Sequence, residues 1–139
     1  MSRPRFHLAF PVNDIAEARR FYGGLLGCPE GRSAENWVDF DLYGHQIVAH
    51  YAPDECTPPP TGAVDGHQVP CRHFGLLLDW SDWESLAEKF RDAGFEFVIE
   101  PYVRFEGQPG EQGTFFVRDP AGNHLEFKTF RNDDQIFAA

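Results

Sequence analysis

A chain of 139 residues is about one domain in length and can bury a substantial core. Its hydrophobic content of 42% is typical of a globular protein, and its formal charge of −10 argues against non-specific binding to nucleic acid or anionic membranes. No secretory leader or membrane-spanning run is recognisable, and three cysteines without CxxC spacing argue against a disulfide framework or a thiolate zinc site. We therefore expect a cytoplasmic protein with no nucleic-acid or membrane partner.

The first part of the chain predicts a strand, a helix and then further strands. Residues 5–12 (RFHLAFPV) alternate large apolar side chains with other residues, which indicates a strand. A helix is expected to follow, capped by Asn13 or Asp14 and ended by Gly27. Residues 36–43 (NWVDFDLY) and 44–52 (GHQIVAHYA) predict two strands joined at a turn near Gly44. The Pro-rich residues 53–69 are expected to be a connector without regular structure.

The same order of elements begins again after the connector. Residues 72–80 (RHFGLLLDW) predict a strand, and the next segment predicts a helix that starts with a capping box of Ser81 and Glu84 and ends at Gly94. The runs FEFVIEPYVRF, GTFFVRD and HLEFKTF supply further strands. We interpret the chain as one domain of two repeated βαβββ modules, over about residues 3–52 and 70–130.

Aligning the two modules at Gly44 and Gly122 shows where they differ. The segments GHQIVAH and GNHLEFK then keep the same apolar positions, but Val48 stands in the first where Glu126 stands in the second. His7 and His73 each lie opposite the large apolar residues of the strand that opens their module. If the two curved sheets form one open barrel, His7, His73 and Glu126 converge inside it. Two imidazoles and a carboxylate are a common ligand set for a divalent metal.

The two modules, the segment FHLAFPVNDIAEARRFYGGLLG and the segment FVRDPAGNHLEFK together resemble the vicinal oxygen chelate superfamily. This group includes glyoxalases, bleomycin resistance proteins and extradiol dioxygenases, and the resemblance covers about residues 5–130. It implies an α+β fold in which two βαβββ modules form an open, cup-shaped mixed β-barrel around a metal site, with the helices outside. It also implies that His7, His73 and Glu126 hold the metal.

The resemblance further implies a reaction class. Glyoxalase I and the related epimerases add a fourth protein ligand at the position of Val48, which cannot bind a metal. A three-ligand site is more similar to the small single-chain extradiol dioxygenases, and implies iron(II) and a catechol-like substrate, although manganese, zinc or nickel suit the same ligands. The alternatives are a metal-dependent thiol transferase, lyase or epimerase, and a non-catalytic dimeric drug-binding protein.

Other polar residues are expected around this site. His50 lies two residues beyond Val48 on the same strand face, where it is a candidate general acid/base or an additional ligand. Gln46 and Lys128 share the predicted cavity face, and Arg104 begins a polar loop over residues 104–114, so these three are candidate contacts to a small-molecule substrate. The resemblance implies a homodimer, in which one subunit supplies His7 and its partner the other two ligands; an intrachain site is the alternative.

Overall fold

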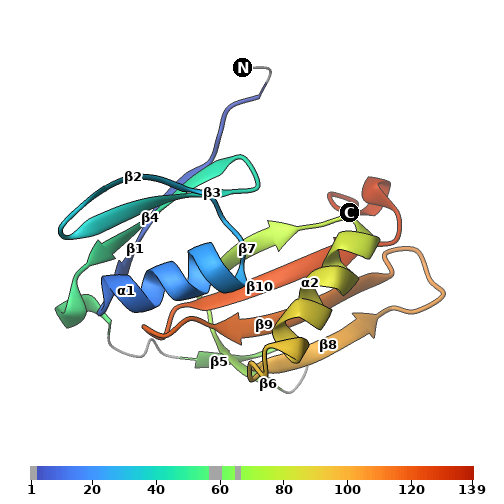
Figure 1. Cartoon of the computed structure of the whole chain (residues 1–139). Helices are drawn as coiled ribbons and strands as arrows, with labels where there is room; N and C mark the ends of the chain where they lie inside the picture. Colours follow the sequence, from blue (N-terminus) through green and yellow to red (C-terminus); the bar gives the residue numbers. More distant parts are fainter. Residues whose placement is uncertain (1–2, 57–60, 65–66) are drawn as a thin grey trace. The chain divides into compact units, whose positions relative to one another are not determined.

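The computed structural model describes residues 3–56, 61–64 and 67–139. They form two compact units, the first made of Met1–Pro58 with Asp119–Asn123 and the second of Pro59–Arg118 with His124–Ala139. Each unit contains its own four-stranded mixed sheet (Figure 1). The predicted α+β class and the two βαβββ modules are confirmed. No helix of the described residues is both long and apolar enough to cross a membrane.

The sheet of the first module has the order β1-β4-β3-β2, in which β1 runs parallel to β4 and the other pairs are antiparallel. The strand β2 was not predicted, because all five of its residues are exposed and therefore show no apolar alternation. The elements of this module are β1 (His7–Val12), α1 (Ile15–Ala18), the π-helical segment η1 (Arg19–Leu25), β2 (Glu30–Ala34), β3 (Trp37–Leu42) and β4 (His45–Tyr51).

The first helix begins where the sequence predicts, but it changes type after one turn. The carboxylate of Asp14 caps it by accepting a hydrogen bond from the backbone N–H of Glu17 at 3.0 Å. From Arg19 onward the turn widens, and the N–H of Leu26 donates to the carbonyl of Phe21, five residues earlier, at 2.8 Å. The pair Gly23–Gly24 weakens the α-helical preference of this segment, which accounts for the difference.

The sheet of the second module has the order β7-β10-β9-β8, and α2 packs on one face of it (Figure 1). The predicted stripe on α2 is buried, and the rings of Trp83 and Phe90 both pack against Phe115. The elements are β7 (Phe74–Leu77), α2 (Trp80–Asp92), β8 (Ile99–Arg104), β9 (Gln112–Arg118), β10 (His124–Phe130) and the short 3₁₀ segment η3 (Asp133–Gln135).

The predicted start of this second helix was wrong. The N-cap is Asp79 rather than Ser81, so the expected capping box of Ser81 with Glu84 lies inside the helix. Trp80 accounts for the earlier start, because its indole packs at a tilt against Trp83 and carries the guanidinium of Arg131 over its ring, 3.4 Å from the ring centroid. This aromatic packing orders a turn that the sequence pattern assigned to the preceding strand.

The Pro-rich connector contains regular structure that was not expected. A 3₁₀ turn, η2 (Pro53–Glu55), is followed by the antiparallel pair β5 (Thr61–Val64) and β6 (His67–Pro70). Val69 anchors the pair, because its side chain is 2% exposed and clusters with Ile99 and Phe116 of the second module. One buried valine among prolines and glycines is too weak a signal to predict a strand from sequence.

The turn before β10 is held in the first unit by a buried carboxylate. Asp119 is 3% exposed and accepts hydrogen bonds from the hydroxyl of Tyr22 at 2.6 Å and from the backbone N–H groups of Ala121 and Asn123 at 2.9 and 2.8 Å. The side-chain amide of Asn123 donates to Asp119 and to the carbonyl of Pro11, both within 2.9 Å. The Asp and Asn of the RDPAGNHLEF segment therefore build this turn.

Replacing Tyr22 with phenylalanine is expected to lower the free energy of unfolding by about 1–3 kcal/mol, because a buried hydrogen bond to a carboxylate is lost. Burial, and then the nearby Asp119 carboxylate, raise the pKa of Tyr22 well above its usual value. The folded state therefore keeps this proton when the unfolded chain loses it above about pH 10, so Tyr22 contributes stability that declines as pH rises beyond that point. Urea unfolding at several pH values should show the difference between wild type and Tyr22→Phe shrinking above about pH 10. A constant difference would contradict this account.

Candidate metal centre

His73 and Glu126 form a contacting pair in the second module. His73 directly precedes β7, and Glu126 lies in the middle of β10, where it pairs with Gly75. The imidazole Nε2 lies 3.2 Å from the carboxylate Oε1, and the two side chains are 27% and 18% exposed. Gly75 permits this close pairing, since a Cβ at that position would lie 1.7 Å from the carbonyl oxygen of Glu126. Both side chains lie on the sheet face opposite α2, because α2 packs against Phe115 and Phe127, whereas Glu126 and the ring contact of His73, Phe116, lie on the alternate face.

The neighbours of this pair determine which atoms keep free lone pairs. The Nδ1 of His73 lies 3.0 Å from the carbonyl oxygen of Pro70, which can only accept, so Nδ1 carries the N–H. The hydroxyl of Thr114 donates to Oε2 of Glu126 at 2.6 Å. In the neutral ring, Nε2 of His73 is then an unprotonated acceptor that faces the carboxylate Oε1 of Glu126. Two acceptors at this distance need a cation between them, either a second ring proton or a metal ion.

The register of the two sheets confirms the alignment of the modules. Glu126 pairs with Gly75, two residues after His73, and Val48 pairs with Ala9, two residues after His7. Gly44 and Gly122, which set the alignment, both have positive φ, at 91° and 95°. The position equivalent to Glu126 in the first module is therefore an apolar Val48, which is 6% exposed.

His7 lies in the other unit, on the first strand of the first module. Its Nδ1 is 2.7 Å from the Oε1 of Gln46, the residue directly opposite it on β4. Within residues 3–56, 61–64 and 67–139, no group of three or more His, Cys, Asp or Glu side chains is placed to hold a metal ion. The structure thus brings together His73 and Glu126 of the three predicted ligands.

The remaining predicted site residues each lie on a strand of their own module. His50 is exposed and lies on β4 opposite Pro11, four pairs along from His7 and Gln46. Lys128 is half-buried on β10, on the face of Glu126, with its ammonium 5.5 Å from the ring centroid of Phe130. Arg104 ends β8, with its guanidinium 5.1 Å from the ring centroid of Phe105. Their catalytic and substrate-binding roles stay predictions.

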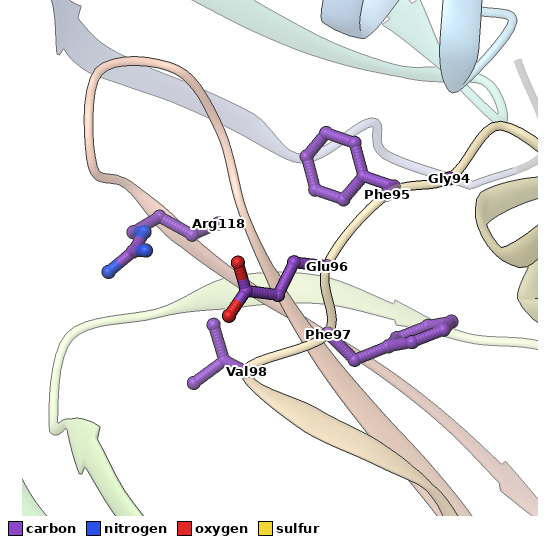
Figure 2. Close-up of a pocket in the computed structure, with 6 residues that line it drawn as sticks. All are labelled: Gly94, Phe95, Glu96, Phe97, Val98 and Arg118. Carbon is purple, nitrogen blue, oxygen red and sulfur yellow. The ribbon is translucent and has the colours of Figure 1, made fainter.

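A surface hollow of about 460 Å³ lies elsewhere in the second unit (Figure 2). It is formed by the segment between α2 and β8 and by Arg118 at the end of β9, and its lining consists of Gly94, Phe95, Glu96, Phe97, Val98 and Arg118. The rings of Phe95 and Phe97 also pack on Phe90, so they belong to the core beneath α2. None of the lining residues was predicted to belong to the metal site.

Sequence reasoning missed the residues that hold the two side chains in place. Thr114 is 4% exposed and lies on β9, two pairs along from Phe116, the partner of Glu126. Its strand pattern shows only that it shares a face with Phe116, so the contact to Glu126 depends on the hairpin register. Pro70 acts through its backbone carbonyl, so its side chain gives no sequence signal for this contact. Only the folded structure identifies these partners.

The two modules and their last-strand carboxylate define the class of protein. A model of the Glyoxalase/Bleomycin resistance protein/Dioxygenase superfamily matches residues 6–127, and the chain belongs to this superfamily. The crystal structure of a glyoxalase/bleomycin resistance protein/dioxygenase from Alicyclobacillus acidocaldarius is similar, with 31% identity, a TM-score of 0.79, and coverage of 99% of this chain and 98% of that chain.

Two further relatives have more specific names. Virulence protein STM3117 of Salmonella typhimurium is 25% identical over 124 residues, which make up 89% of this chain and 82% of that protein. The genomically encoded fosfomycin resistance protein FosX from Listeria monocytogenes is 15% identical, with a TM-score of 0.71 and coverage of 97% of this chain and 98% of that chain. At this identity, the second likeness shows a shared fold.

Proposed function

We propose that this protein is a divalent-metal-dependent enzyme in which His7, His73 and Glu126 are the protein ligands. The observation that carries the proposal is the pair formed by His73 and Glu126, whose facing lone pairs need a cation between them. Membership of a superfamily whose members generally use divalent metals supports the same assignment. His7 is included because its module repeats the second, with a histidine at the equivalent place.

The spacing of the donor atoms fits a metal ion. Two ligand atoms that each lie about 2.1 Å from a metal, at an angle of about 90–109°, are about 3.0–3.4 Å apart. The distance of 3.2 Å between Nε2 and Oε1 falls in this range. Imidazole nitrogen and carboxylate oxygen are both ordinary ligands of iron, manganese, zinc and nickel. The donor set therefore fits a divalent metal without favouring one of the four.

The number of ligands points to a reaction that needs open coordination positions. Val48 stands where a fourth ligand would lie, so three protein ligands leave room for two adjacent substrate oxygens and one further molecule. We infer an extradiol-type ring cleavage of a catechol-like substrate as the leading reaction. When bound, iron(II) would supply the electronic coupling between the substrate and dioxygen, and both oxygen atoms of dioxygen would enter the product.

The chain's own residues would bind the substrate and move its proton. His50 is the proposed acid/base that accepts a phenolic proton, as its exposed ring on the His7 face of the first sheet allows. Lys128 and Arg104 lie on the Glu126 face of the second sheet, where their positive charges would attract an anionic group of the substrate. A thiol transferase, lyase or epimerase would use the same three ligands and different substrate oxygens.

The deciding experiment combines metal analysis with an assay of oxygen uptake. Protein purified without oxygen or chelators is analysed for bound metals and then mixed with a panel of catechols in an oxygen electrode. The proposal expects about one iron per chain and catechol-dependent uptake of oxygen with a coloured ring-opened product. Bound zinc, manganese or nickel without uptake would keep the metal site and reject the dioxygenase reaction. Protein that is purified without metal and cannot be loaded with any of these metals would reject both the metal site and the dioxygenase reaction.

Replacing His50 with alanine is expected to lower kcat about 100-fold or more while leaving the metal content unchanged, because the loss removes an acid/base and not a ligand. Metal analysis and steady-state kinetics on the same preparation measure the two quantities. Replacing His45, which accepts a hydrogen bond from the N–H of Phe6, provides a histidine control on the same strand. Loss of metal from the His50 variant would instead identify His50 as a ligand.

A further inference from the structure

Three polar side chains of the first module form a continuous chain of hydrogen bonds that ends at His7. The Nδ1 of His7 lies 2.7 Å from Oε1 of Gln46, and the Nε2 of Gln46 lies 3.3 Å from Oδ2 of Asp39. The three residues come from β1, β4 and β3, which are neighbours in the sheet. Gln46 is directly opposite His7, and Asp39 is the diagonal neighbour of Gln46, since it pairs with Val48.

The direction of each hydrogen bond follows from the chemistry of the groups. The carboxylate of Asp39 can only accept, so the NH₂ group of Gln46 faces it and donates. The carbonyl oxygen of the Gln46 amide is thereby turned toward His7, and it too can only accept. The Nδ1 of His7 must then carry the N–H. In the neutral ring, the lone pair is left on Nε2, the same tautomer that the Pro70 carbonyl imposes on His73.

We propose that Gln46, oriented by Asp39, is a positioning residue that sets the tautomer and ring direction of His7 so that its Nε2 is available to a metal. This rests on the proposed function for the role of His7 as a ligand. A histidine ligand commonly donates its other N–H to a carboxylate or carbonyl, and loss of such a partner typically weakens metal binding 10–100-fold. The two bonds engage both ends of the Gln46 amide, which favours this role over a substrate contact.

The second module holds its histidine in a different way. At the position equivalent to Gln46, which is directly opposite His7, the second module has His124 at the start of β10. There the backbone carbonyl of Pro70 takes the place of the amide oxygen, and no side chain is needed. Gln46 is consequently the side chain whose removal changes one ligand histidine and leaves the other unaffected.

The test measures the tautomer of His7 in the metal-free protein and the affinity for zinc. Gln46→Met keeps the side-chain length and removes both hydrogen bonds, whereas Asp39→Asn is the conservative control, because its amide oxygen still accepts from Gln46. Long-range ¹H–¹⁵N spectra, recorded at about pH 8.5 where free imidazole is neutral, report which ring nitrogen carries the proton. Competition with a chromophoric chelator gives the Kd for Zn²⁺.

The wild type is expected to show the Nδ1–H form of His7. Gln46→Met is expected to shift His7 toward the Nε2–H form and to raise the Kd for Zn²⁺ about 10–100-fold, while Asp39→Asn stays within about threefold of the wild type. An unchanged tautomer in Gln46→Met would overturn the proposal. The variant His7→Ala tests the proposed function separately. An unchanged Kd for Zn²⁺ in His7→Ala would remove His7 from the ligand set. The tautomer of His7 in Gln46→Met would still show whether Gln46 orients the His7 ring.

Discussion

Replacing Glu126 with alanine is expected to weaken metal binding by more than about 100-fold, beyond the range typical for the loss of an outer partner. Glu126 supplies the only negative charge in the proposed ligand set, and its Oε1 faces Nε2 of His73 at 3.2 Å. Removing it leaves the two imidazoles alone to hold the ion and leaves the hydroxyl of Thr114 without its acceptor. Elemental analysis of the purified variant and Zn²⁺ titration measure the loss.

A matched control separates this effect from the loss of any carboxylate on the same sheet. Glu100→Ala removes an exposed carboxylate from β8, whose ion pair with Arg91 is long, at 4.0 Å. We expect it to retain the wild-type metal content and melting temperature. Glu126→Ala with full metal loading and an unchanged Kd would show that the pair with His73 is an ordinary surface ion pair, and the proposed site would be rejected.

The same variant decides which chain supplies His7. Mixing unfolded His7→Ala and Glu126→Ala chains and refolding them produces heterodimers if the protein is a homodimer. If the site is shared between subunits, one of the two sites in each heterodimer contains both histidines and Glu126. Half of the dimers are heterodimers after random mixing, so about one quarter of all sites are restored. An intrachain site would regain none. Metal bound per chain after refolding distinguishes the two arrangements directly.

Replacing Asp119 with alanine is expected to lower the free energy of unfolding by about 3–5 kcal/mol, since several buried donors lose their acceptor together. The carboxylate accepts from the hydroxyl of Tyr22, from two backbone N–H groups and from the amide of Asn123, and it is 3% exposed. Urea unfolding followed by circular dichroism measures the change. The effect is expected to exceed that of Tyr22→Phe, which removes one of these donors.

Asp119→Asn serves as the conservative comparison. Its amide oxygen can still accept from the N–H groups of Ala121 and Asn123, but its NH₂ group would face the NH₂ group of the Asn123 side chain. We expect a loss of stability between those of Tyr22→Phe and Asp119→Ala. Equal stability of Asp119→Ala and the wild type would contradict the role of this carboxylate in holding the turn before β10.

The local pattern of the sequence was sufficient for most of the architecture. Strand β10 is the clearest case: Leu125 and Phe127 are fully buried, whereas Glu126 and Lys128 remain partly exposed, as period-two alternation predicts. The alignment of the modules was likewise available from sequence, because the turn at Gly122 and its counterpart share a backbone conformation that favours glycine. Alternation and turn chemistry depend on near neighbours in the chain, so they can be predicted without the fold.

The sequence by itself also predicted that His73 and Glu126 lie close together, since each stands opposite the apolar side of its strand, and the structure places their side chains 3.2 Å apart. Only the tertiary structure decided which groups form hydrogen bonds to Glu126, His73 and the equivalent His7. The hydroxyl of Thr114 donates to Glu126 because the register of the β9–β10 hairpin brings them together. The hydroxyl of Tyr22 donates to Asp119, which lies 97 positions later in the sequence. The amide of Gln46 is directed at His7 by a carboxylate on a third strand. Hydrogen bonds of this kind depend on strand register and long-range packing, which no local pattern encodes.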